Sequence, residues 1–249
     1  IGTVLDLTDR IKAVNDLKKS EERYRTLFNR VPVGLYRTNN KGEILQVNQA
    51  FKEILGYPVN ESPVGTNVEK YYVNQSARLD WEKKIQEKGF VHNYEVRLKC
   101  RDGQIIWVKD SAKAVFNKKN DTIFYDGAIE DITEQKQLES ERERLSKAIE
   151  QAAEAFIITD TRGKIEYLNP AFETMTGYQR KEAINKNPRF LKSGKQEKDF
   201  YQNMWDTISR GKIWHGKMVN KRKDGSFFTD ESTISPIFDT DGNIVYYVG

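Results

Sequence analysis

Three residues near the C-terminus have side chains suited to binding a flat, partly polar ring. Trp214, Met218 and Asn220 are separated by even numbers of residues in one strand-like segment, so all three face the same side of a sheet. An aromatic or apolar wall with an amide beside it is a typical lining of a small-molecule pocket. The segment therefore indicates a binding surface. The alternative is structural, with Trp214 in a packed core and Asn220 as a hydrogen bonder at a strand end.

The rest of the sequence offers little catalytic chemistry. Cys100 is the single cysteine, and His92 and His215 are the two histidines, which excludes an internal disulfide framework and a four-cysteine zinc site. There is no Walker A loop and no GxSxG, HExxH or protein-kinase motif, so no enzyme activity is expected of this segment itself. The net charge of +4 combines interspersed charges of both signs, which does not suggest a nucleic-acid partner.

Length and hydropathy set the broad class. The 249 residues suit two domains of about 100 to 150 residues each. No apolar run approaches the roughly 18 residues needed to cross a bilayer, so no membrane contact is expected. These features predict a soluble, cytoplasmic protein of two modules.

An internal repeat organises the chain. Residues 41–57 (KGEILQVNQAFKEILGY) match residues 162–178 (RGKIEYLNPAFETMTGY). The Arg-Asp-Gly at 101–103 recurs as Lys-Asp-Gly at 223–225, with one residue of additional offset. Two copies of one domain that differ in a loop would give this pattern.

The repeat also sets the expected domain boundaries. Residues 2–9 match residues 127–134, which indicates that the chain opens on the end of an earlier copy. We therefore predict the end of a preceding copy at 1–10, a linker helix at 11–30, a first domain at 31–133, a linker helix at 134–152, and a second domain at 153–249 whose last strand is truncated.

Each copy has the pattern of an antiparallel α+β domain. In the second copy, two short apolar runs joined by a glycine turn predict a hairpin. Asn169 and Pro170 then favour the start of a helix, and Gly177 favours its end. A further helix and three strands are expected at 196–209, 213–221, 226–237 and 243–249. The predicted fold class is α+β, with two five-stranded antiparallel sheets, each carrying helices on one face, joined by a connecting helix.

The linkers are predicted to be helices with an apolar stripe. Val14, Leu17, Tyr24 and Phe28 alternate at spacings of three and four residues, with Glu21 interrupting them. The second linker repeats this spacing with Leu138, Leu145, Ile149 and Ala152, interrupted by Arg142. The pattern suits either a solvated helix or a two-stranded coiled coil, and about two heptads do not separate the two.

The end of each copy continues directly into the next helix. Asp131 and Thr133 belong to an Asp-Ile-Thr-Glu sequence that has no glycine or proline to decouple strand from helix. We predict Thr133 as the N-cap of the helix. Asp131 is expected to anchor the junction, either by pairing with a basic residue or by accepting backbone N–H bonds, and so to relay a signal.

These features together resemble tandem PAS domains with PAC motifs. The resemblance rests on Asn-Pro-Ala-Phe at 169–172, Thr-Gly-Tyr at 176–178, Lys-Asp-Gly at 223–225, Ser-Pro-Ile at 235–237 and Asp-Ile-Thr-Glu at 131–134. It implies PAS folds with a pocket between sheet and helices, homodimerisation, and an output domain in the same parent chain, such as a histidine kinase or a diguanylate cyclase. An alternative is a ligand-free PAS pair that serves only dimerisation and relay.

The second copy is similar to flavin-binding PAS domains of redox sensors and to the LOV branch. The LOV stretch Asn-Cys-Arg-Phe-Leu-Gln reads Asn-Pro-Arg-Phe-Leu-Lys here, and Pro188 in place of the cysteine excludes photoadduct chemistry. The resemblance implies that Asn187 and Arg189 meet the tail or phosphate of FAD, and that Asn220 and Asp230 meet its ring edge. The first copy lacks these residues and is expected to have an apolar pocket for a small ligand, or no ligand at all.

Overall fold

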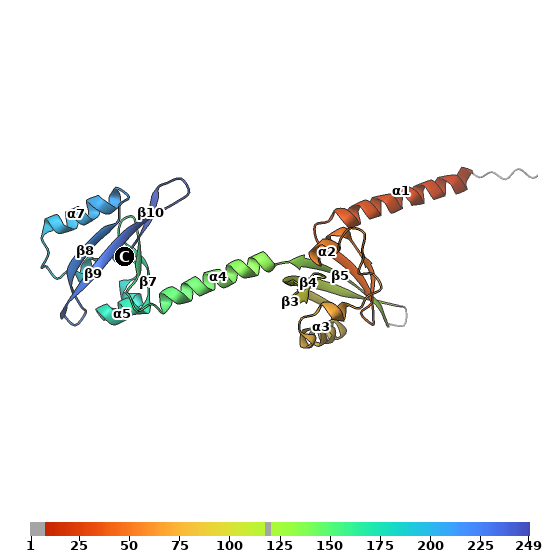
Figure 1. Cartoon of the computed structure of the whole chain (residues 1–249), viewed down its shortest axis with the longest axis horizontal. Coiled ribbons are helices and arrows are strands. Elements are labelled where there is room, and N and C mark those ends of the chain that lie inside the picture. Colours follow the sequence, from red (N-terminus) through yellow and green to blue (C-terminus); the bar gives the residue numbers. More distant parts are fainter. Residues whose placement is uncertain (1–7, 118–120) are drawn as a thin grey trace, which may run out of the picture. The chain divides into compact units, whose positions relative to one another are not determined.

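The computed structural model describes residues 8–117 and 121–249, and the chain divides into two compact units, Ile1–Glu139 and Ser140–Gly249 (Figure 1). Each unit contains one copy of the repeat. The prediction that residues 1–10 end a preceding copy lies largely outside the described residues.

The first unit forms one five-stranded antiparallel sheet in the order β2-β1-β5-β4-β3. The last strand, β5, therefore lies in the middle of the sheet, between the first and the fourth. The elements are α1 (Thr8–Arg30), β1 (Gly34–Asn39), β2 (Ile44–Val47), α2 (Gln49–Ile54), the 3₁₀ helix η1 (Val68–Tyr71), α3 (Gln75–Lys88), β3 (Phe90–Lys99), β4 (Ile105–Phe116) and β5 (Thr122–Asp131).

The second unit repeats this order as β7-β6-β10-β9-β8. Helix α4 (Thr133–Glu150) leads into it. The elements that follow are β6 (Ile157–Asp160), β7 (Ile165–Leu168), α5 (Pro170–Thr176), α6 (Arg180–Ala183), the 3₁₀ helix η2 (Pro188–Leu191), α7 (Lys198–Ser209), β8 (Trp214–Lys221), β9 (Phe227–Phe238) and β10 (Ile244–Val248). The predicted fold, two five-stranded antiparallel sheets with helices, is confirmed.

One asparagine in each unit joins the preceding helix to the domain. Asn48 is fully buried; its Oδ1 accepts from the N–H of Phe51 at 2.9 Å, which caps α2, and its Nδ2 donates to the carbonyl of Phe28 in α1 at 3.0 Å. Asn169 makes both bonds in the second unit, at 3.2 and 3.0 Å. The sequence predicted the cap, and the structure adds the tie to the linker helix.

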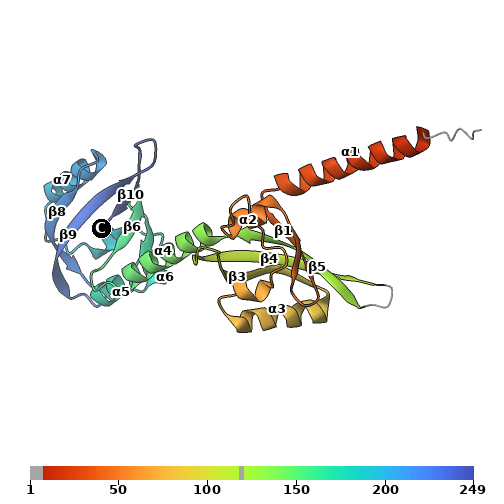
Figure 2. The ribbon, with the colours of Figure 1, turned by 45° about the vertical axis from the view of Figure 1, so that its right-hand side comes forward.

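The helices cover one face of each sheet. In the first unit α3 lies along β3 and β4 (Figure 2), and Trp81 of α3 packs with Ala112 of β4 in one cluster of buried residues. Phe51 of α2 packs with Val108 of β4 in a second cluster. Ala112 and Val108 have the same parity, so both helices lie on this inner face of the sheet.

Among the described residues, no helix is long and apolar enough to cross a bilayer. Within the same ranges, no three side chains of the His, Cys, Asp or Glu type are grouped so that they could hold a metal ion.

Candidate functional site

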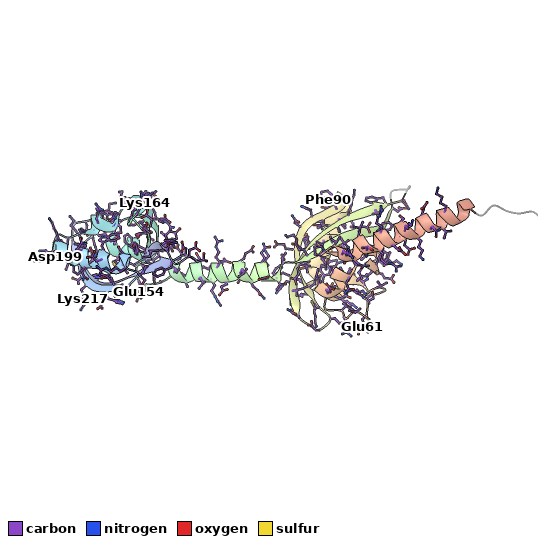
Figure 3. All side chains as sticks on the ribbon, turned by 90° about the horizontal axis from the view of Figure 1, so that it is seen from above. Glu61, Phe90, Glu154, Lys164, Asp199 and Lys217 are labelled. Atoms are coloured by element: carbon purple, nitrogen blue, oxygen red, sulfur yellow. The ribbon has the colours of Figure 1, made fainter. Side chains whose placement is uncertain are left out.

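The three residues of the predicted binding surface lie on the inner face of β8. Trp214 is 5% exposed, and its ring meets that of Phe200 on α7 edge-on, with centroids 5.4 Å apart. Asn220 is 9% exposed and Met218 is half-buried. Lys217, on the opposite parity, is exposed and lies at the periphery of the unit in Figure 3. The strand thus brings an aromatic ring, a thioether and an amide onto one covered face.

Asn220 and Asp230 form a polar pair on that face. Asn220 Nδ2 donates to Asp230 Oδ1 at 2.9 Å, and Ser232 Oγ donates to the other carboxylate oxygen at 2.5 Å. Asp230 lies on β9 directly opposite Met218, so strand pairing places the carboxylate beside the amide. An asparagine side chain can make four hydrogen bonds, and this pair uses one of them. The pair can therefore offer both a donor and acceptors to a planar ligand.

Asn187 and Arg189 lie on the segment that approaches β8 from the helices. Asn187 caps η2: its Oδ1 accepts from the N–H of Arg189 at 3.1 Å, and its Nδ2 donates to the carbonyl of Arg162 at 3.2 Å. The side chain of Arg189 is exposed. The segment then reaches Lys192, which pairs with Asn220 in an isolated β-bridge. The backbone thus places the segment next to β8, while the amide of Asn187 holds the loop.

The first unit contains the same cap, which the sequence comparison missed. Asn67 precedes η1; its Oδ1 accepts from the N–H of Glu69 at 2.9 Å, and its Nδ2 donates to the carbonyl of Lys41 at 2.8 Å. The residue after η1 likewise forms an isolated bridge, with Leu98. Asn67 is therefore the counterpart of Asn187. The cap that both asparagines form is a structural role. Cofactor binding by Asn187 stays a prediction.

The polar pair distinguishes the second unit from the first. At the positions of Asn220 and Asp230 the first unit has Leu98 and Val108, which are 7% and 0% exposed. Both belong to its largest cluster of buried residues. The first unit fills this part of its interior with its own apolar side chains.

The first unit buries a carboxylate at another position, which the sequence analysis overlooked. Asp110 on β4 is 4% exposed, and Tyr36 Oη donates to its two oxygens at 2.9 and 3.2 Å. Burial raises the pKa of Asp110 to about 7, although the hydrogen bond from Tyr36 acts in the opposite direction. The alternation of side chains along the strand could have predicted this burial, because Asp110 has the same parity as the buried residues Ile106, Val108 and Ala112.

Two buried donors of α3, Arg78 and Trp81, act on this carboxylate and lower its pKa. Arg78 is 5% exposed and Trp81 is 1% exposed. Neither Arg78 Nε nor Trp81 Nε1 has a hydrogen-bond partner within the described part of the chain. The guanidinium of Arg78 is also paired with Glu82, at 2.8 Å. The charge on Asp110 is thus only partly compensated.

The junction between β5 and α4 is held by both predicted relay residues. Asp131 Oδ1 accepts from the N–H of Thr133 at 2.8 Å, one of the two contacts expected for it. Thr133 is the first residue of α4, and its Oγ1 accepts from the N–H of Trp107 on β4 at 2.9 Å. The prediction of Thr133 as an N-cap is therefore wrong, because its hydroxyl binds the sheet. Lys136 adds an ion pair with Glu95 of β3 at 2.6 Å.

Comparison with known proteins gives a consistent family. The family model described as PAS domain matches residues 31–134 and 153–249. The chain is 37% identical over 100 residues to the nitrogen fixation regulatory protein of Klebsiella oxytoca, covering 40% of this chain and 20% of that protein. It is 35% identical over 106 residues to a blue-light photoreceptor of Listeria monocytogenes, covering 41% and 42%. The chain thus spans a fifth to two fifths of these relatives.

A solved structure adds a similar neighbour. The light-state structure of the blue-light photoreceptor Aureochrome1 LOV is 31% identical in sequence and covers 41% of this chain and 83% of its own, with a TM-score of 0.37.

Proposed function

The chain belongs to the PAS domain family, and we propose that it is the sensory input and signal-transduction segment of a larger sensor protein. Regulators and photoreceptors among its relatives support this role. The output activity would lie in other parts of the parent, and the resemblance favours a histidine kinase or a diguanylate cyclase. Both use nucleoside triphosphates, so we place the protein in the cytoplasm.

We propose FAD as the cofactor of the second unit, sensing redox state or oxygen. The observation that carries this proposal is the pair of Asn220 and Asp230 on the inner face beside Trp214. The polar edge of a flavin ring alternates carbonyl and N–H groups. An amide and a carboxylate together supply the donor and acceptor that such an edge requires. When bound, the group would supply reversible redox chemistry.

The remaining predicted residues fit the same arrangement. Trp214 and Met218 would pack against the apolar part of the ring. Arg189, exposed at the start of η2, would pair with the phosphates. Asn187 would hold the loop from which Arg189 extends.

Relay is proposed to run through the linker helices in a homodimer. Apolar side chains at heptad spacing are exposed on both helices; Leu17 is 70% exposed on α1 and Leu145 is 56% exposed on α4. A second copy of the chain would cover both stripes as a parallel coiled coil. Glu21 and Arg142 fall at equivalent positions of the two stripes, so each coil would contain one like-charged layer that weakens it.

The absorption spectrum of the full chain, purified without refolding, tests the cofactor. Oxidised flavin gives bands near about 370 and 450 nm, and denaturation should release it for identification. The matched control is the double variant Asn220→Leu and Asp230→Val, which carries the residues of the first unit. We expect flavin in the wild type and its loss in the variant, and light scattering of the same sample tests the dimer.

The competing proposal is a ligand-free PAS pair that serves dimerisation and relay. A colourless wild-type protein that neither copurifies with nor takes up added FAD would favour that role. Flavin that stays bound in the double variant would instead remove Asn220 and Asp230 from the site.

A further inference from the structure

A contact across three strands sets the first unit apart. Tyr36 projects from β1 over β5 and reaches Asp110 on β4, where its Oη lies 2.9 and 3.2 Å from the two carboxylate oxygens (strands labelled in Figure 2). The ring passes over Gly127 of β5. A Cβ at Gly127 would lie 2.3 Å from Cζ of Tyr36, which is too close for any side chain. Glycine at this position is therefore required for the contact.

The surroundings of Asp110 contain few charges. The titratable and charged groups that act on Asp110 or on Tyr36 are Tyr36 itself on β1, Tyr72 after η1, Arg78 on α3 and Tyr94 on β3. Further out, Glu82 pairs with Arg78, Asp80 pairs with Lys84, and Tyr125 on β5 packs against Trp81. Arg78 is the cation among the groups that act on Asp110 directly. The tyrosines are neutral near pH 7, because burial raises the pKa of each above its ordinary value.

We propose that the first unit is a proton sensor in which Asp110 is the proton-binding site, and that its change of charge is transmitted through Tyr36 to β5 and α4. The proton is exchanged with water. This function is independent of any flavin in the second unit.

The two charge states make different contacts. Ionised Asp110 accepts a charge-assisted hydrogen bond from Tyr36 and attracts Arg78 and Trp81 of α3, whose Nε and Nε1 have no hydrogen-bond partner among the described residues. Protonated Asp110 loses that attraction, and Arg78 keeps Glu82 as its partner. Such a difference in contacts is what shifts a two-state equilibrium. Titration in this unit falls near neutrality, because burial raises the pKa of Asp110 to about 7.

The path to the output helix is short. Asp110 pairs with Ile129 of β5, two residues before Asp131. The same strand β4 holds Thr133 through Trp107. A displacement of β4 against β5 would therefore move both Asp131 at the end of β5 and Thr133 at the start of α4.

The second unit lacks this device. Gly249 is its counterpart of Gly127, and Ile157 stands at the position of Tyr36. The N–H of Ile157 donates to the carbonyl of Gly249 at 2.9 Å, and a Cβ at Gly249 would lie 3.3 Å from the Ile157 side chain. Proton sensing is thus assigned to the first unit alone.

The test is a pH titration of the full chain by NMR, with aspartate labelled with ¹³C at its side-chain carboxyl carbon. We expect one aspartate resonance with a midpoint near pH 7 that is absent in Asp110→Asn. The backbone amides of Gly127, Ile129 and Thr133 should follow the same midpoint. Two matched controls are Asp126→Asn, which removes the ion pair of Arg37 across the same strands, and His92→Gln, because His92 is the histidine of this unit.

A second variant keeps the test decisive if Asp110→Asn does not fold. Tyr36→Phe retains the ring and removes a bond that favours the ionised form, so the midpoint should move upward. A carboxyl carbon of Asp110 that titrates below about pH 5 would overturn the proton site. A midpoint near pH 7 that β5 and α4 do not follow would overturn the coupling, and a midpoint abolished by His92→Gln would assign the titration to the histidine.

Discussion

The two units place a carboxylate at different positions along equivalent strands. In the first unit it is the buried Asp110, contacted by Tyr36 from across the sheet; in the second it is the half-buried Asp230, contacted by Asn220 of the neighbouring strand. Asp230 corresponds to Val108, two residues before Asp110. Because side chains alternate along a strand, a shift of two residues keeps the group on the inner face but changes its neighbours.

This shift separates two kinds of site within one fold. A carboxylate closed in by tyrosines and a tryptophan between the sheet and α3 can exchange little except a proton. A carboxylate and an amide on the outer pair of strands, beside a half-buried methionine, can face a larger planar ligand. Repeated sequence therefore predicts the repeated fold and not a repeated ligand.

The largest effect should come from removing the buried tryptophan of each unit. Trp81→Ala and Trp214→Ala should each destabilise their own unit by about 3 to 5 kcal/mol, since both rings are almost fully buried in edge-on aromatic pairs. Urea unfolding followed by circular dichroism measures this loss. The two variants should differ in colour, because only Trp214→Ala removes a wall of the proposed flavin pocket. Equal loss of flavin in both variants would contradict the assignment of the cofactor to the second unit.

The next effect concerns pH and the first unit. The pKa of Asp110 is raised by burial to about 7, above an unfolded value of about 3.9, so the folded state binds the proton more tightly. This stabilisation is complete below about pH 4, decreases as the pH rises, and is gone above about pH 7. Its upper limit is on the order of 4 kcal/mol.

Urea denaturation at pH 5 and pH 8 measures that dependence. Asp110→Asn should remove most of the difference between the two pH values in the transition of the first unit, whereas Asp126→Asn should retain it. A wild-type unit that is equally stable at both values would contradict the raised pKa.

A smaller effect is expected when the second unit receives the residues of the first. Asp230→Val alone gives the second unit the residue that the first unit has at the equivalent position, the fully buried Val108. Because the variant removes a partly buried charge, the cofactor-free protein should become slightly more stable. The affinity for FAD should fall by roughly 2- to 10-fold, since a ring-edge hydrogen bond contributes about 0.5 to 1.5 kcal/mol. Fluorescence titration with FAD measures the affinity, and Glu231→Gln, on the exposed side of the same strand, is the control.

Local signals in the sequence predicted most of the fold. Asn169, Pro170 and Gly177 marked a helix, because capping and backbone preferences act over a few residues. Strand parity likewise put Trp214 and Asn220 on one covered face. Each of these inferences needed only neighbours along the chain.

Contacts between distant residues could not be predicted in this way. Tyr36 and Asp110 are 74 positions apart and meet only because β5 inserts between their strands. The hydroxyl of Thr133 binds the backbone of Trp107, 26 positions away, so its local pattern suggested a cap instead. The sheet order had to be known before either contact could be drawn.

The smallest predicted effect compares the two asparagine caps. Asn67→Ala and Asn187→Ala each remove a cap of a 3₁₀ helix and a bond to the preceding turn, so each should cost about 1 kcal/mol in its own unit. Without FAD the two losses should match, because the contacts match. With saturating FAD the loss for Asn187→Ala should grow if this residue also holds the cofactor, since the variant would then lose stabilisation by binding. Thermal unfolding with and without FAD measures both, and equal losses in the two conditions would leave Asn187 with the structural task that it shares with Asn67.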